Sequence, residues 1–191
     1  MRRQTQADRF LTAIHRNTAN TALLERLPHL SLPDCWLVAG CLFQSVWNDA
    51  IGRPANESIK DYDIFYFDDV DLSYEAEDRV IRQVADACAD LGLPIEMKNQ
   101  ARVHLWYGER FGPGYPSLAD AKDGIKRFLV AGTCVGIGAS PSNFGELFAP
   151  YGLNELFAGV LRPNPLNLPG NRFSEKAATY MARWPHLVIE T

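Results

Sequence analysis

The chain has 191 residues, of which 47% are hydrophobic and 22% are charged, and these values are close to those of an ordinary soluble globular domain. Its net charge of -4 disfavours broad, sequence-independent nucleic-acid binding, which needs a basic face. We expect one domain, 1–191, with a core over about 30–140 and a C-terminal helical extension over about 141–191.

The first third of the chain predicts a helix, a strand and a second helix. Apolar residues recur at helical spacing over 6–27. A short continuous apolar run at 35–39 is typical of a buried strand. The run stops at Gly40, and the spacing then becomes helical from Leu42 to Ala50. This part therefore reads as a strand, a tight glycine turn and a helix.

The middle of the chain begins with a second strand over 59–67, followed by an acidic turn at 68–71 that we interpret as solvated. A helix is expected over 73–91, because Ser73 suits the N-cap and the apolar stripe is regular. Gly92 then favours the helix end. The residues at 95–97 and 101–107 predict strand segments.

Ser117 is expected to cap a helix through Phe128, and 133–137 predicts another strand. Helices are expected over 153–160 and 174–183, separated by an ordered proline-rich loop at 162–165. Strands that alternate with helices indicate an α/β (α+β) fold, in which a mixed sheet is flanked by helices and further helices are added at both ends.

The cysteines have no metal-ligand or disulfide-framework spacing, so reduced thiols are expected at Cys35, Cys41, Cys88 and Cys134. The basic N-terminus runs into polar sequence, and no apolar stretch is long enough for a signal peptide or a membrane span. We expect a cytoplasmic protein with no membrane partner.

Two carboxylates, Asp61 and Asp63, are separated by one residue on a predicted strand, so both should point to the same face. Such close carboxylates repel each other unless a cation lies between them, and Mg²⁺ (or Mn²⁺) prefers this kind of oxygen ligand. Glu96, between Ile95 and Met97, is the candidate for a third carboxylate, as metal ligand or as base. The alternative is that the two aspartates have no metal-binding role, because a lone Asp-x-Asp is common in protein sequences.

A turn between a strand and a helix offers free backbone N–H groups to an anion, and Gly40-Cys41 occupies such a turn. Gln44, near the start of the same helix, is a candidate for contact with a phosphate or a sugar. Cys41 is not expected to be a nucleophile, since no His or Asp partner is indicated.

Arg102 and His104 lie two residues apart on a predicted strand, so they should share a face and could meet a phosphate or an acceptor. The alternative is an ordinary half-exposed strand with polar partners. The tryptophans Trp36, Trp47 and Trp106 are expected in the core rather than as stacking platforms.

Gly40-Cys41 opening a helix, Asp61-Tyr62-Asp63 on a strand and Ile95-Glu96-Met97 resemble three motifs of the DNA polymerase beta-like nucleotidyltransferase superfamily. Most of the chain, including Arg162-Pro163-Asn164-Pro165, is similar to a bacterial family of uncharacterised nucleotidyltransferases. The superfamily usually has Gly-Gly or Gly-Ser where this chain has Gly40-Cys41, so the cradle would rely on backbone amides. The segment from this turn to Asp61 is also longer than usual.

The resemblance implies a magnesium-dependent transferase fold with a mixed sheet, and it does not supply a substrate. The candidate nucleotide-binding residues are Gly40, Cys41, Gln44, Arg102 and His104. The expected reaction moves a nucleoside monophosphate to an acceptor hydroxyl, with metal held by Asp61, Asp63 and Glu96. The acidic charge favours a small molecule or a protein over RNA as acceptor. A catalytically weak nucleotide sensor on the same scaffold, and a phosphoesterase that uses water, are the alternatives. The sequence does not determine which nucleobase the donor carries, nor the oligomeric state.

Overall fold

A computed structural model describes residues 4–111, 115–166 and 172–190 of the chain. Within these residues, a five-stranded sheet has the order β3-β2-β1-β4-β5, with β2 and β3 parallel and the other neighbours antiparallel. A two-stranded parallel sheet, β6-β7, lies near the C-terminus. The strands are β1 (Trp36–Val38), β2 (Tyr62–Tyr66), β3 (Ile95–Asn99), β4 (Gly136–Gly138), β5 (Leu147–Phe148), β6 (Val160–Leu161) and β7 (Val188–Ile189).

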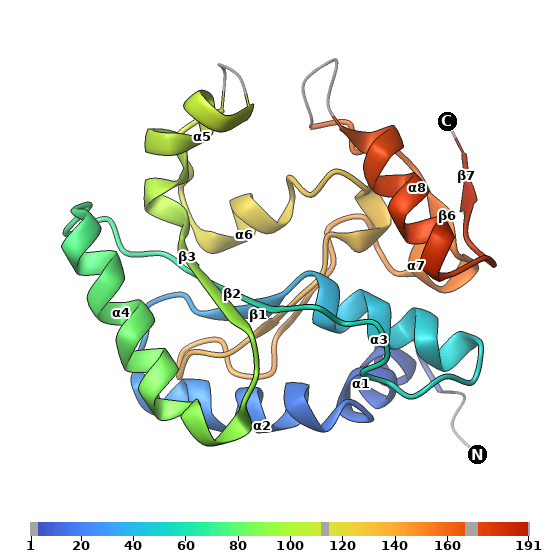
Figure 1. The fold of residues 1–191 in the computed structure, drawn as a ribbon, viewed down its shortest axis with the longest axis horizontal. Coiled ribbons are helices and arrows are strands. Elements are labelled where there is room, and N and C mark those ends of the chain that lie inside the picture. The colour runs from blue at the N-terminus through green and yellow to red at the C-terminus, as the bar shows by residue number, and fades with distance from the viewer. Residues whose placement is uncertain (1–3, 112–114, 167–171, 191) are drawn as a thin grey trace.

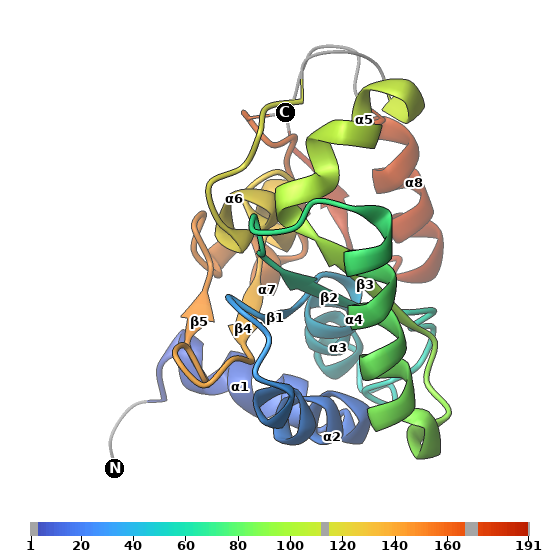
Figure 2. The same ribbon diagram turned by 90° about the vertical axis from the view of Figure 1, so that its left-hand side faces the viewer.

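Helices surround the larger sheet (Figures 1 and 2). The α-helices are α1 (Gln6–His15), α2 (Thr18–Arg26), α3 (Gly40–Ala50), α4 (Tyr74–Ala87), α5 (Val103–Phe111), α6 (Ala121–Ile125), α7 (Asn154–Ala158) and α8 (Phe173–Arg183). Short 3₁₀ turns are η1 (Leu27–Leu30), η2 (Ala89–Leu91), η3 (Gln100–Arg102) and η4 (Ala131–Thr133). The mixed sheet flanked by helices confirms the predicted α/β (α+β) class.

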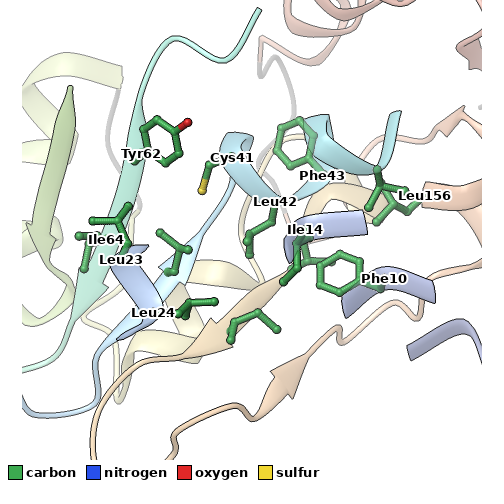
Figure 3. Close-up of a cluster of buried hydrophobic side chains, with 14 of the residues drawn as sticks. Phe10, Ile14, Leu23, Leu24, Cys41, Leu42, Phe43, Tyr62, Ile64 and Leu156 are labelled. Atoms are coloured by element: carbon green, nitrogen blue, oxygen red, sulfur yellow. The ribbon is translucent and has the colours of Figure 1, made fainter. Parts of the chain in front are cut away.

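One face of the sheet packs on α1, α2, α3 and α4. Leu37, Ile64 and Met97 are paired across β1, β2 and β3, so their side chains point to the same face. All three are buried in the main apolar cluster. Figure 3 shows Tyr62 and Ile64 of β2 facing the helical residues Leu23 and Leu24 of this cluster.

The opposite face carries the alternate residues. Trp36 and Val38 of β1 form a smaller apolar cluster with Ala121 and Ile125 of α6, and Phe65 of β2 packs against it. Asp63 lies two residues before Phe65, so its side chain belongs to this face as well. A short helix covers this side, which leaves room beside it for polar groups.

The N-terminal region forms two helices, so the single helix expected over 6–27 is wrong. Asn17 interrupts it: the Asn17 side chain accepts a hydrogen bond from the Ala19 backbone N–H and starts α2. An asparagine competes with helical bonding through such side-chain contacts. The interruption lets α1 pack on α3 while α2 continues below the sheet.

The strand expected over 101–107 is also wrong, because this segment forms η3 and α5. The Asn99 side chain accepts from the Ala101 N–H at 3.1 Å, which starts a helical turn directly at the end of β3. The apolar residues of this segment resembled a strand, but the cap decided the outcome.

Farther along, the N-cap of α6 is Asp120 rather than Ser117, and α6 ends at Ile125 instead of Phe128. The strand expected over 133–137 begins only at Gly136, after η4.

The helix expected over 73–91 is confirmed in its main part. The Ser73 hydroxyl accepts from the Ala76 N–H at 3.2 Å, as an N-cap should. The α-helix ends at Ala87 and continues as η2 to Leu91. Gly92 then takes a left-handed conformation with φ 60°, which a glycine adopts without strain.

Helix α8 is held to α3 by aromatic side chains. Phe43 and Trp47 of α3 lie 5.5 and 5.2 Å from the Tyr180 ring, and Trp47 lies 5.4 Å from Trp184. The Trp184 indole N–H also donates to the Asn48 side chain at 2.7 Å. This cluster fixes a helix from the end of the chain beside the first strand–helix turn.

The loop at 162–165 is ordered by a buried asparagine, in line with the expectation. The Asn164 side chain donates to the backbone oxygens of Lys126 and Phe128 and accepts from the Tyr151 hydroxyl at 2.8 Å. Among the described residues, no helix has both the length and the apolar character needed to cross a bilayer.

Candidate active site

Asp63 lies on the inner strand β2, where it pairs with Val38 of β1 on one side and with Glu96 of β3 on the other. Residues directly opposite each other on neighbouring strands point to the same face, so the Asp63 and Glu96 side chains leave the sheet together. Asp61 precedes β2, and its Oδ1 lies 3.9 Å from the point where a Cβ on Gly40 would be. The three acids therefore belong to one face, next to the start of α3.

The pKa of Asp63 is shifted by its environment on this face. Burial is the main cause that raises the pKa of Asp63 to about 7, and the negative charges of Asp61 and Glu96 add to it. Lys176 and Lys98 act in the opposite direction and lower the same pKa. The site thus holds more negative charge than its own lysines neutralise.

The donor set suits a hard divalent cation, because carboxylate oxygens are the ligands that such ions prefer. Asp63 is mostly enclosed beside a second carboxylate, an arrangement that an added positive charge would relieve. Among the described residues, no three His, Cys, Asp or Glu side chains are already placed around one metal position. Glu96 is exposed and lies beside Asp63 by strand register, so a rotamer change is what would carry its carboxylate inward.

The turn that begins α3 has a strained backbone. Ala39, the N-cap, has φ 61° and ψ -133°, a conformation that L-residues rarely adopt. The Ala39 carbonyl accepts from the N–H groups of Leu42 and Phe43. The N–H groups of Gly40 and Cys41 have no hydrogen-bond partner within the part of the chain that the structure describes. These two free amides are the groups on which the expected anion site depends.

A side chain on Gly40 would displace the Gln44 amide, which lies directly beside it. A Cβ at this position would lie 2.7 Å from Gln44 Nε2, which is too short for ordinary contact. Gln44 is itself buried, and its Oε1 has no hydrogen-bond partner among the described residues. An unsatisfied buried amide beside the acids is typical of a site that a ligand completes.

The Cys41 side chain points away from this cradle. Its Sγ donates to the Val38 carbonyl at 3.3 Å and lies among apolar side chains (Figure 3). Burial, followed by the charge of Asp63, raises the pKa of this thiol well above its usual value. The Cys41 thiol is therefore part of the core, and a raised pKa disfavours the nucleophilic thiolate.

Arg102 is not brought to the carboxylates, because it is engaged on the side of α4. Its guanidinium forms a buried ion pair with Glu77, and its Nε donates to the Leu72 carbonyl at 2.9 Å. His104 follows on α5, where its Nδ1 is buried without a partner among the described residues. The expectation that Arg102 and His104 share the face of a strand is wrong, since the chain turns helical there.

Three residues at the site were missed from the sequence. Lys98 follows Glu96 by two residues on β3, so strand alternation would have placed it on the same face. Lys176 and Tyr180 come from α8, and both interact electrostatically with Asp63. Burial raises the pKa of Tyr180, and the two aspartates raise it further. Nothing local in the sequence signals that α8 lies beside β2.

The long segment between α3 and Asp61 is accommodated as an ordered loop. The Asn48 amide donates to the carbonyls of Ala55 and Glu57 at 3.2 and 2.8 Å. An Arg183 guanidinium N–H donates to the Ser58 carbonyl at 3.1 Å. The loop is therefore tied to both α3 and α8, which border the site.

The mixed sheet, with two aspartates beside a glycine-led helix, agrees with the arrangement expected of a nucleotidyltransferase-type domain. A model of a nucleotidyltransferase family matches residues 25–189, and the chain belongs to that family. No curated protein matches the chain significantly.

Solved structures show the same fold. An NMR structure described as revealing a CCA-adding enzyme head domain has a TM-score of 0.75 and 23% identity, covering 98% of this chain and 97% of that one. A CCA-adding enzyme with CTP has a TM-score of 0.53 and 13% identity, covering 98% of this chain and 44% of that one. The Thermotoga maritima CCA-adding enzyme complexed with tRNA has a TM-score of 0.53 and 16% identity, covering 98% and 43%. The chain thus spans less than half the length of these two enzymes.

Proposed function

We propose that this protein transfers a nucleoside monophosphate from a nucleoside triphosphate to an acceptor hydroxyl. The observation that carries the proposal is the position of Asp61, Asp63 and Glu96 on one face of the sheet, beside free amides at Gly40 and Cys41. Such a site pairs a cluster of negative charge with an anion cradle. A triphosphate that brings a divalent cation satisfies both.

Asp61 and Asp63 are the proposed ligands of Mg²⁺ or Mn²⁺, and Glu96 is the proposed third ligand or the base. The metal would neutralise charge that develops on the α-phosphate during transfer. The Gly40 and Cys41 amides would hold the departing phosphates, and Lys176 and Lys98 supply positive charge near Asp63.

The acceptor oxygen forms a bond to the α-phosphorus while the bond to the β-phosphate oxygen breaks. Pyrophosphate leaves with that electron pair, and the hydroxyl proton passes to Glu96 or to water. The residues of the chain therefore position the two partners and balance charge, which is most of what phosphoryl transfer requires.

The proposed donor is supported by solved relatives of this fold that are described as complexes with CTP and with ATP. The acceptor we favour is a small molecule or a protein, because the net charge of the chain is -4. The relative in complex with tRNA is more than twice as long as the matched part, so its RNA contacts are not assigned to this chain.

The test is turnover of each of the four nucleoside triphosphates, labelled at the α-phosphate, with Mg²⁺ or Mn²⁺. We expect pyrophosphate together with a labelled adduct detected by mass. Free nucleoside monophosphate would instead identify a phosphoesterase, and nucleotide binding without turnover would identify a sensor.

Asp63→Asn is the decisive variant, and we expect it to lower turnover by about 10²-fold or more, the usual scale for loss of a charge-stabilising group. Asp69→Asn is the matched control, since Asp69 is exposed in the acidic turn that precedes α4. Full activity of Asp63→Asn, with circular dichroism unchanged, would remove the proposed role of the aspartates.

A further inference from the structure

A cavity of about 170 Å³ lies on the acidic face of the sheet, beyond Asp63 and Glu96. Phe65 and Lys98, which are register partners on β2 and β3, form its floor. They follow Asp63 and Glu96 by two residues on the same face, so the cavity begins roughly 7 Å from the acids at about 3.3 Å per residue. The cavity is therefore adjacent to the proposed reaction centre.

Several of the side chains that line the cavity are aromatic, and Arg127 adds a cation to the wall. Phe128 contacts Phe65 edge to face, with ring centroids 5.8 Å apart. Trp106 and Tyr107 contribute from α5. Trp106 is only half-buried, so the expectation that it is a core residue is wrong. Rings arranged around a space of this size suit a planar ligand.

Arg127 and Lys98 give the cavity its charge. Arg127 Nε is buried and has no hydrogen-bond partner within the described ranges. The guanidinium lies 5.9 Å from the centre of the Tyr115 ring, which holds it at the cavity wall. A buried donor without a partner is costly, and an anionic group on a ligand would satisfy it.

The position of the cavity distinguishes donor from acceptor. In an in-line displacement, the attacking oxygen enters opposite the leaving group. Gly40 lies at the Asp61 end of β2, so pyrophosphate held there leaves toward α3. Phe65 and Lys98 lie at the other end of the same row of residues. A hydroxyl bound over Phe65 and Lys98 would therefore approach the α-phosphate from the side opposite Gly40.

We propose that this cavity binds the acceptor, and that the acceptor is a small molecule in which a hydroxyl-bearing planar ring carries an anionic group. The ring would stack between Trp106 and the two phenylalanines, and the anion would pair with Arg127 and Lys98. This inference rests on the proposed transferase function and specifies its second substrate.

The experiment uses 4-(hydroxymethyl)benzoate as the probe, because it combines a ring, an anion and a primary hydroxyl. Benzyl alcohol lacks the anion, and glycerol 3-phosphate lacks the ring. Binding to the full chain is followed by saturation-transfer NMR, which does not depend on turnover. We expect the probe to bind more tightly than either comparison compound.

Arg127→Met should weaken probe binding about tenfold or more, the scale of a lost hydrogen bond to a charged group. Trp106→Leu should weaken it about tenfold through lost stacking. Arg79→Met, on the solvent side of α4, is the matched control and should leave probe binding unchanged. Unchanged binding in both cavity variants would overturn the proposal.

A second experiment tests whether the probe and a nucleotide bind at the same time. The α,β-methylene analogue of the nucleotide that turns over should bind together with the probe. Displacement of the probe would assign the cavity to the base of the donor and overturn the acceptor proposal. Preferred labelling of a short RNA at its 3′-hydroxyl, unaffected by Arg127→Met, would also overturn it. Failure of every nucleotide to turn over would instead contradict the transferase function. Because probe binding is measured by NMR without turnover, the acceptor proposal and the transferase function are tested separately.

Discussion

Charged groups are enclosed at two places around the same strands, and their environments differ. On the α4 side, Glu77 and Arg102 form an ion pair, and the Glu77 carboxylate also accepts from the Asn99 N–H at 2.8 Å. On the other face, Asp63 is enclosed beside Asp61 and Glu96, which carry the same sign of charge. One set is balanced inside the protein and the other is not.

The difference is whether each charged group has its counter-charge within the chain. The paired set connects α4 to the end of β3, and each group has its partner in the chain, so no ligand is required. The like-charged set has no such internal balance, because Asp61 and Glu96 both oppose ionisation of Asp63. A bound cation, as proposed above, would relieve this repulsion. Natural proteins retain such an arrangement where a site needs it.

The largest expected effect is on the paired set. Arg102→Met should lower the free energy of unfolding by about 3–5 kcal/mol, because Glu77 would remain buried without its partner. Urea denaturation followed by circular dichroism measures the change. Arg79→Met removes an exposed ion pair with Asp71 and should cost at most about 1 kcal/mol. Equal decreases in the free energy of unfolding for the two variants would show that the buried Arg102–Glu77 pair stabilises the fold no more than the exposed pair does.

Substitution in the like-charged set should stabilise the protein instead of destabilising it, and the size of the effect should depend on pH. Because the pKa of Asp63 is raised to about 7, native Asp63 keeps a proton that the unfolded chain releases above its usual value of 3.8. The free energy of unfolding therefore falls as pH rises from about 4 to about 7 in chelator-treated protein. Asp63→Asn should remove this fall and stabilise the protein at pH 8 by about 2–4 kcal/mol.

Glu96→Gln is the matched comparison, since Glu96 is exposed and acts on Asp63 only through space. Its effect on the pH dependence should be smaller than that of Asp63→Asn. A stability profile of the wild type that is flat between pH 4 and pH 8 would contradict the assigned environment of Asp63.

Divalent cation should stabilise the wild type by a smaller amount. Binding to the native state alone adds about 2.7 kcal/mol when Mg²⁺ is present at a hundred times its dissociation constant. Thermal unfolding with and without a chelator measures this, and Asp69→Asn should respond as the wild type does. A Mg²⁺ effect that survives in Asp63→Asn would place the ion elsewhere.

The smallest expected effect concerns the strained turn. Ala39→Gly should raise the free energy of unfolding by about 0.5–1 kcal/mol, since a glycine tolerates the positive φ of this residue. Ala85→Gly, at an exposed position inside α4, should lower it by about the same amount. Destabilisation by both variants would mean that the Ala39 conformation carries little strain.

Much of the fold followed from local patterns. The apolar run before Gly40, the capped helix after Ser73 and the alternation around Asp63 each depend on neighbours within a few residues. The segment after Asn99 did not follow, because its helical form depends on the Asn99 cap together with tertiary burial of Ala101 and Val103. The role of Arg102 changed for the same reason, since the new helical direction turns it toward Glu77.

The sequence by itself determined that two aspartates share a face near a glycine turn, because strand alternation and glycine geometry are properties of adjacent residues. The tertiary structure alone decided that Glu96 lies directly opposite Asp63 and that the Cys41 thiol enters the core. It also decided that Lys176 of α8 lies close enough to lower the pKa of Asp63. These placements depend on strand register and on aromatic packing between α3 and α8, which join residues far apart in the chain.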